Sequence, residues 1–176
     1  GMKSVGKHFP GHGGVYEDSH VELPIDKKKL SYLIENDIAP YIALKNKLDA
    51  VMCAHILFSN VDSAIPSFSS VWIKNILKKR LGYKGIVFSD DLSMAGSGEE
   101  NLITKCTKSF DAGCDMVIIC NDRDGVKNVL NHLVKNNFEL NDKLSVMKKL
   151  CDVCWNELKE NKRAISIKNK LNKIWG

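Results

Sequence analysis

The segment from Lys7 to His20 (KHFPGHGGVYEDSH) holds three histidines, a lysine and two carboxylates around a glycine-rich turn. Glycine lets the backbone approach a ligand closely, so the polar side chains of this segment could converge on a small molecule. Asp18 and His20 stand two residues apart. A carboxylate bound to one imidazole nitrogen makes the other nitrogen a better proton shuttle. The spacing leaves a second interpretation open, in which His20 is a surface histidine with an incidental aspartate nearby.

Two adjacent carboxylates, Asp90 and Asp91, close the apolar run GIVFSDD at residues 85–91. Packing does not explain them, because an unpaired buried charge is strongly destabilising. Consecutive side chains of a strand point to opposite faces, so at most one of the two faces a shared site. We expect a carboxylate nucleophile or a metal ligand here. The alternative is that one carboxylate caps the following turn and the other is solvated.

Metal and phosphate chemistry find little support in the sequence. The three histidines His8, His12 and His20 share no fixed ligand spacing, and the glycines do not match a phosphate-binding loop. Only Cys151 and Cys154 of the six cysteines form a C-x-x-C pair. That pair lies in a segment with helical periodicity, so we interpret both as core or semi-core thiols. The spacings of the histidines, glycines and cysteines therefore indicate neither a metal site nor a phosphate site.

The elements that must position these residues follow an alternating pattern. Four short apolar runs without polar alternation each precede a helical segment, which predicts a parallel α/β sheet covered by helices. Each run passes its polar residues to the loop that follows, the end at which such sheets and barrels bind their ligands. Four strands fit an open sheet or half of an eight-stranded barrel. The predicted runs are Ser4–Phe9, Ala50–Ala54, Gly85–Phe88 and Met116–Cys120.

The helical segments are predicted from apolar residues at helical spacing and from their end signals. The first should begin at Asp26, a residue type that favours the N-cap position. The last should run as a helix from Asp142 to Glu160. The intervening helices are expected around residues 71–81, 102–112 and 125–135.

Composition limits the function classes. The chain has 176 residues, 44% hydrophobic and 27% charged, which predicts a single globular domain over residues 1–176. Its net charge is +5, but the basic runs at residues 27–29 and 78–80 lie beside apolar residues at helical spacing. We interpret them as solvated helix faces and expect no nucleic-acid partner. No apolar run suits a membrane helix and no hydrophobic leader opens the chain, so we expect a cytoplasmic protein with reduced thiols and no membrane partner.

Taken in order, five stretches resemble glycoside hydrolase family 3, and within it the bacterial β-N-acetylglucosaminidases (β-N-acetylhexosaminidases) of peptidoglycan recycling. The stretches are KHFPGHG at 7–13, DSH at 18–20, VMCAH at 51–55, GIVFSDDLSM at 85–94 and AGCDMVIICN at 112–121. The resemblance implies a (β/α)₈ TIM-type barrel and a retaining glycosidase that removes terminal β-linked N-acetylglucosamine and needs no metal and no organic cofactor.

The resemblance also implies roles for individual residues. Asp90 corresponds to the nucleophile, His20 to the acid/base and Asp18 to its dyad partner. Lys7 and His8 correspond to residues that bind sugar hydroxyls. Asp91 would then cap or support the site, while His55 receives no catalytic role.

The position of these motifs in the chain departs from the family pattern. KHFPGHG lies on about the fifth barrel strand of the family but begins here at residue 7, so the chain corresponds to strands five to eight with their helices. Such a half-barrel exposes two strand edges and an apolar inner face, which predicts a homodimer or pairing with the missing half. The alternatives to an active enzyme are a truncated, non-catalytic remnant and a sugar-binding domain.

Overall fold

The computed structural model describes residues 2–139, 142–148 and 154–175 of the chain. The chain divides into two compact units, and the larger one, Lys3–Met147, contains every strand that the structure describes. The smaller unit includes two helices that contact each other, α5 (Trp155–Glu160) and α6 (Lys162–Trp175). Every residue for which the sequence predicts a role in catalysis or sugar binding belongs to the larger unit.

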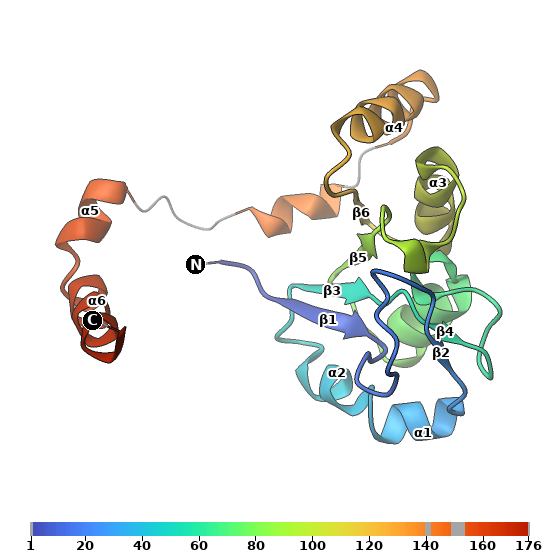
Figure 1. The fold of residues 1–176 in the computed structure, drawn as a ribbon, viewed down its shortest axis with the longest axis horizontal. Coiled ribbons are helices and arrows are strands. Elements are labelled where there is room, and N and C mark those ends of the chain that lie inside the picture. The colour runs from blue at the N-terminus through green and yellow to red at the C-terminus, as the bar shows by residue number, and fades with distance from the viewer. Residues whose placement is uncertain (1, 140–141, 149–153, 176) are drawn as a thin grey trace. The chain divides into compact units, whose positions relative to one another are not determined.

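The main sheet has four parallel strands in the spatial order β1-β3-β5-β6, which confirms the predicted parallel α/β fold (Figure 1). Three of the four strands keep close to their predicted bounds. The third extends further, because Asp91 pairs with Ile118 of the neighbouring strand. Both carboxylates therefore lie on the strand and not in the loop after it. The strands are β1 (Val5–Phe9), β3 (Ala50–Cys53), β5 (Ile86–Asp91) and β6 (Met116–Ile118).

A second, two-stranded parallel sheet joins β2 (Ile25–Asp26) to β4 (Leu57–Phe58). The predicted helix start at Asp26 is wrong. Asp26 is buried in β2, where its carbonyl accepts a hydrogen bond from the Ser59 amide. Its carboxylate accepts bonds from the amide and the ammonium group of Lys28. The Asp26 carboxylate thus stabilises a turn and does not cap a helix. The helix begins only at Leu30.

Helical segments follow each strand of the main sheet, as predicted. After β1 come α1 (Leu30–Glu35) and α2 (Ala39–Leu44), and after β3 come the short turn η1 (Pro66–Phe68) and the helix η2 (Val71–Arg80). After β5 come the turn η3 (Ala95–Ser97) and α3 (Leu102–Ala112). After β6 come α4 (Arg123–Lys135) and the 3₁₀ segment η4 (Asp142–Met147).

The main core lies between the sheet and these helices. Trp72 of η2 is fully buried, with its ring 6.0 Å from that of Phe9 in β1 and 5.2 Å from that of Phe58 in β4. These aromatic contacts join three elements that are distant in sequence. Buried aromatic pairs of this kind stabilise the fold by more than the burial of their apolar area alone would. The helix η2 is thereby fixed against the sheet.

The opposite face of the sheet is partly covered. Its buried residues Ala50, Ile86 and Phe88 pack against Leu144 and Met147 of η4. The sequence predicts a bare inner face, so the structure corrects that expectation in part. In the described part of the chain no further strand pairs with the outer edge of β1 or of β6. The predicted open edges are therefore present.

The single helix predicted from Asp142 to Glu160 is wrong. The first part is the 3₁₀ segment η4, and Cys154 has an extended backbone at the start of α5. Cys154 is exposed, so it is not the core thiol that the sequence predicts, and Cys151 lies outside the described residues. A local apolar pattern does not hold a helix together unless another element covers it.

Candidate active site

Asp90 lies near the carboxyl end of β5, where pairing with β3 and β6 fixes the strand on both sides. Alternation along the strand puts its side chain on the same face as Phe88. The side chain is 14% exposed, and its Oδ2 lies 3.5 Å from Nε2 of His8. Its Oδ1 accepts a hydrogen bond of 2.9 Å from the Asp91 amide. Asp90 is thus a half-buried carboxylate with one oxygen oriented by the backbone.

Asp91 points to the other face and has a different task. One of its oxygens accepts hydrogen bonds of 2.9 Å from the amides of Ser93 and Cys120. The Ser93 hydroxyl donates to the same carboxylate at 2.8 Å. Burial raises the pKa of Asp91, but the bonds from Ser93 and Cys120 outweigh it and leave this pKa below its ordinary value. Asp91 therefore ties the turn after β5 to the chain after β6, as expected of a capping residue.

His8 faces Asp90 from β1, with 28% of its side chain exposed. Burial lowers the pKa of His8, and Asp90 opposes that effect without reversing it. The charges of Lys7, His12 and His20 lower the same pKa further. The contact between His8 and Asp90 is therefore one between a neutral imidazole and a carboxylate at neutral pH. Lys7 itself is exposed beside it.

Asp18 and His20 form a pair in the loop between β1 and β2. Nδ1 of His20 lies 2.7 Å from Oδ1 of Asp18, and the His20 amide donates to the same oxygen at 2.9 Å. These two bonds lower the pKa of Asp18. Both side chains are open to solvent, 64% for Asp18 and 74% for His20. A carboxylate on Nδ1 leaves Nε2 of His20 free to exchange a proton with a substrate.

The three histidines of the first segment have separate partners. His8 faces Asp90, His20 binds Asp18, and Nε2 of His12 lies 3.0 Å from the Ser19 hydroxyl. Within the described ranges no group of three or more His, Cys, Asp or Glu side chains could hold a metal ion.

Of the helices that the structure describes, none is long and apolar enough to cross a bilayer.

His55 follows β3 and is fully buried. Neither of its ring nitrogens has a hydrogen-bond partner in the described part of the chain, and its ring lies 6.3 Å from that of Phe68. Burial lowers the pKa of His55 to about 4, while the charges of Asp90 and Asp91 oppose this fall. His55 is thus a buried, neutral imidazole that follows strand β3.

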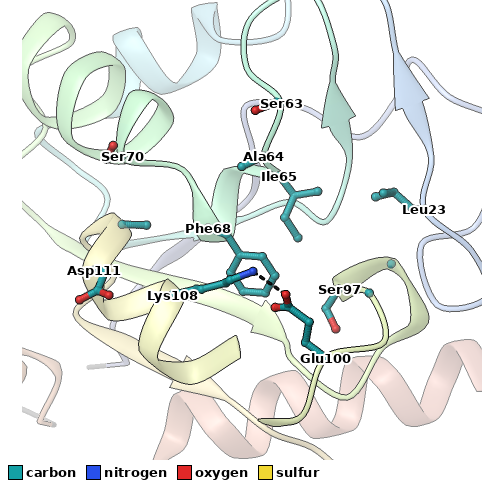
Figure 2. A pocket seen from close by; sticks show the side chains of 13 residues that line it. Leu23, Ser63, Ala64, Ile65, Phe68, Ser70, Ser97, Glu100, Lys108 and Asp111 are labelled. Atoms are coloured by element: carbon teal, nitrogen blue, oxygen red, sulfur yellow. Dashed lines mark hydrogen bonds and ion pairs between the residues drawn. The ribbon is translucent and has the colours of Figure 1, made fainter. Parts of the chain in front are cut away.

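Two pockets border this site without containing its carboxylates. One of about 580 Å³ is lined by Leu23, Phe68 and the ion-paired Glu100 and Lys108, and Figure 2 shows Leu23 on the side opposite Asp111. The other, of about 410 Å³, is lined by Lys7 and His8 together with apolar residues of α2. Asp18, His20 and Asp90 line neither pocket.

A family comparison gives this arrangement its context. Residues 1–150 match the model described as "Glycosyl hydrolase family 3 N terminal domain". The chain belongs to glycosyl hydrolase family 3. The resemblance seen in its motifs is thereby confirmed at the level of the family.

Relatives within family 3 agree in sequence and in fold. The chain is 40% identical over 182 residues to a protein named beta-hexosaminidase from Actinobacillus succinogenes, covering 99% of this chain and 53% of the relative. It superposes on native NagZ from Neisseria gonorrhoeae with a TM-score of 0.73 at 38% identity, covering 86% of this chain and 44% of that one. A family 3 beta-N-acetylglucosaminidase from Paenibacillus sp. gives 0.72 at 30% identity, covering 81% and 28%.

The lengths agree with the predicted half-barrel. The chain spans about half the length of the curated relative from Actinobacillus succinogenes. Its four parallel strands match part of the NagZ fold, and the described sheet does not close into a barrel.

Proposed function

We propose that the chain carries the catalytic groups of a retaining β-N-acetylhexosaminidase. The observation that carries the proposal is the pairing of Asp18 with His20 at 2.7 Å in a family 3 chain whose strand β5 ends with Asp90 and Asp91. The hydrogen bond from the Gly96 amide to the carbonyl of Ser19, which lies between Asp18 and His20, attaches this loop to the turn after β5 and supports the proposal. The names of the relatives support the hexosaminidase activity.

In the first step the Asp90 carboxylate attacks the anomeric carbon of a terminal β-linked N-acetylglucosamine. His20 donates its Nε2 proton to the leaving oxygen as the glycosidic bond breaks, and a glycosyl ester of Asp90 forms. In the second step His20 takes a proton from water, which attacks the same carbon and releases Asp90. Two displacements on one carbon retain its configuration.

The surrounding groups suit these two steps. Asp18 holds Nδ1 of His20 and stabilises the imidazolium that forms in the second step. A histidine acid keeps a second negative charge away from the nucleophile. Lys7 and His8 would bind sugar hydroxyls, and His8 in its neutral form would do so without an ion pair to Asp90.

The wider setting of the enzyme is part of the same proposal. Residues 1–176 would act as one catalytic domain on N-acetylglucosamine-containing fragments of peptidoglycan in the cytoplasm. The support is the likeness of the KHFPGHG and GIVFSDDLSM stretches to enzymes of peptidoglycan recycling.

The open sheet favours a second candidate, a non-catalytic or merely sugar-binding domain. Asp18, His20 and Asp90 line neither of the two pockets named above, and the described sheet does not close into a barrel. A second copy, or the other half of a barrel, would cover the edges of β1 and β6. Light scattering at micromolar concentration should give a mass above that of the 19.7 kDa chain. A monomer would contradict self-association.

The deciding experiment is hydrolysis of an aryl β-N-acetylglucosaminide by the purified chain, with Asp90→Ala alongside. Activity that disappears in Asp90→Ala supports the hydrolase. A folded wild type that binds N-acetylglucosamine without hydrolysing the aryl glycoside supports the second candidate. Equal rates in both proteins would overturn the assignment of Asp90.

A further inference from the structure

Ser19 stands out because it is buried between two exposed residues. It is 3% exposed, whereas the side chains of its neighbours Asp18 and His20 are mostly in solvent. A buried hydroxyl must be hydrogen-bonded to avoid a free-energy penalty. The Ser19 hydroxyl meets this need through Nε2 of His12 at 3.0 Å. The dyad loop, residues 10–24, is therefore attached to the protein between its two reactive residues.

The backbone of Ser19 makes a second attachment. Its carbonyl accepts a hydrogen bond of 3.0 Å from the amide of Gly96, which lies in η3 just after the nucleophile strand. A Cβ atom at Gly96 would lie 2.6 Å from the Ser19 carbonyl oxygen and 3.2 Å from that of Glu22. Both neighbours are backbone atoms of the loop, so the contact as it stands admits only glycine.

The turn that receives the loop is itself firmly held. The Ser97 hydroxyl donates to the carbonyls of Leu92 and Met94, at 2.8 and 2.6 Å. The buried ammonium group of Lys105 binds the Leu92 carbonyl at 3.0 Å and the Ser97 hydroxyl at 2.7 Å. A buried cation with these partners makes η3 costly to displace. The loop therefore docks on a rigid surface that continues directly from Asp90.

The contact between Ser19 and His12 also connects the loop to the surroundings of Asp90. The His12 ring lies 5.6 Å from the His8 ring, and Nε2 of His8 lies 3.5 Å from Oδ2 of Asp90. Ser19 is thus connected to the surroundings of Asp90 through a side-chain path and a backbone path. By contrast, the bonds between Asp18 and His20 are internal to the loop and would survive its displacement.

We propose that Ser19, docked on Gly96 and His12, is the positioning residue that holds the Asp18–His20 dyad toward Asp90. The inference rests on the proposed function for its catalytic meaning, but the docking itself is independent of activity. Ser19→Ala removes the hydrogen bond between the Ser19 hydroxyl and His12. Gly96→Ala forces the Ser19 carbonyl away from the amide of residue 96. The matched control is Gly13→Ala in the same loop, where an added Cβ meets no atom within 4 Å.

The first test measures loop release directly in the full chain. Tyr16 in the dyad loop is fully exposed, so chymotrypsin cleaves after it once the local backbone opens. Mass spectrometry should show the fragment beginning at Glu17 about 5- to 10-fold faster in Ser19→Ala and Gly96→Ala than in wild type. Gly13→Ala should match wild type. Equal cleavage in all four proteins would overturn the proposal whether or not the chain is active.

The second test separates positioning from mere folding. If the wild type hydrolyses aryl β-N-acetylglucosaminides, Gly96→Ala should lower kcat by about 10-fold or more for poor leaving groups and little for good ones. KM and the melting temperature should stay close to those of Gly13→Ala. A uniform loss across leaving groups would contradict positioning of the acid. A released loop in a chain without wild-type activity would support the docking and count against the proposed function alone.

Discussion

Strand β5 and the dyad loop hold the residues of the proposed catalytic site in opposite ways. Asp90 lies on a strand paired on both sides, half-buried and in contact with His8 and the Asp91 amide. Asp18 and His20 are open to solvent and bind mainly each other. The strand is organised by contacts distant in sequence, whereas the dyad is organised by two residues of one turn. Substitutions in the two regions should therefore separate stability from activity.

The largest expected effect is that of Asp90→Asn. Loss of the nucleophile should lower kcat on an aryl β-N-acetylglucosaminide by at least about 10³-fold, since covalent catalysis has no substitute group here. The melting temperature should change little because the amide keeps the shape of the carboxylate. Steady-state kinetics and calorimetry on one preparation check both statements. Retained activity would remove Asp90 from the mechanism.

The substitution His20→Ala tests the role of the dyad loop. It should slow hydrolysis by roughly 10²- to 10⁴-fold for substrates with poor leaving groups, the range for general acid catalysis, and much less for activated aryl glycosides. Stability should not change, because the His20 side chain is mostly in solvent. The rate against leaving-group pKa is the measurement. A flat dependence identical to that of wild type would show that His20 is not the acid.

The third prediction concerns the buried His55 and the pH dependence of the free energy of unfolding. Its pKa is about 4 in the folded chain against 6.5 in an unfolded one, so unfolded protein binds more protons between these values. The neutral state therefore stabilises the fold fully above pH 6.5, and this contribution is lost as pH falls toward 4. The loss is roughly 3 kcal/mol at about 1.4 kcal/mol per pH unit.

Chemical denaturation at pH 7 and pH 4.5 measures this loss in wild type and in His55→Gln, which cannot gain the proton. The free energy of unfolding should fall further in wild type than in the variant. An equal fall in both proteins would show that other groups set the acid sensitivity.

The smallest effect concerns Asp91, the neighbour of the nucleophile. Asp91→Ala removes the acceptor of the Ser93 and Cys120 amides, which should lower the free energy of unfolding by about 1–3 kcal/mol. Residual turnover should remain, in contrast to Asp90→Asn. Urea titration gives the stability and the aryl substrate gives the rate. Stability unchanged from wild type would mean that these bonds contribute nothing net.

Much of this protein could be predicted from its sequence. Unbroken apolar runs followed by helical segments require burial on both faces of each strand, and this fixed the parallel sheet and the end at which polar residues gather. The spacing of Asp18 and His20 made their contact one of two interpretations, and the structure shows that they are hydrogen-bonded. The motifs sufficed to assign the family.

Other features depended on contacts that no local pattern contains. Pairing with Ile118 kept Asp91 on β5 and so separated the tasks of the two carboxylates. Pairing of β2 with β4 took Asp26 out of the first helix, and packing of η4 covered part of the inner face of the sheet. The docking of Ser19 on Gly96 joins residues 77 positions apart. The positions of these residues depend on burial and hydrogen bonding between segments that are distant in sequence. Only the tertiary structure brings those segments together.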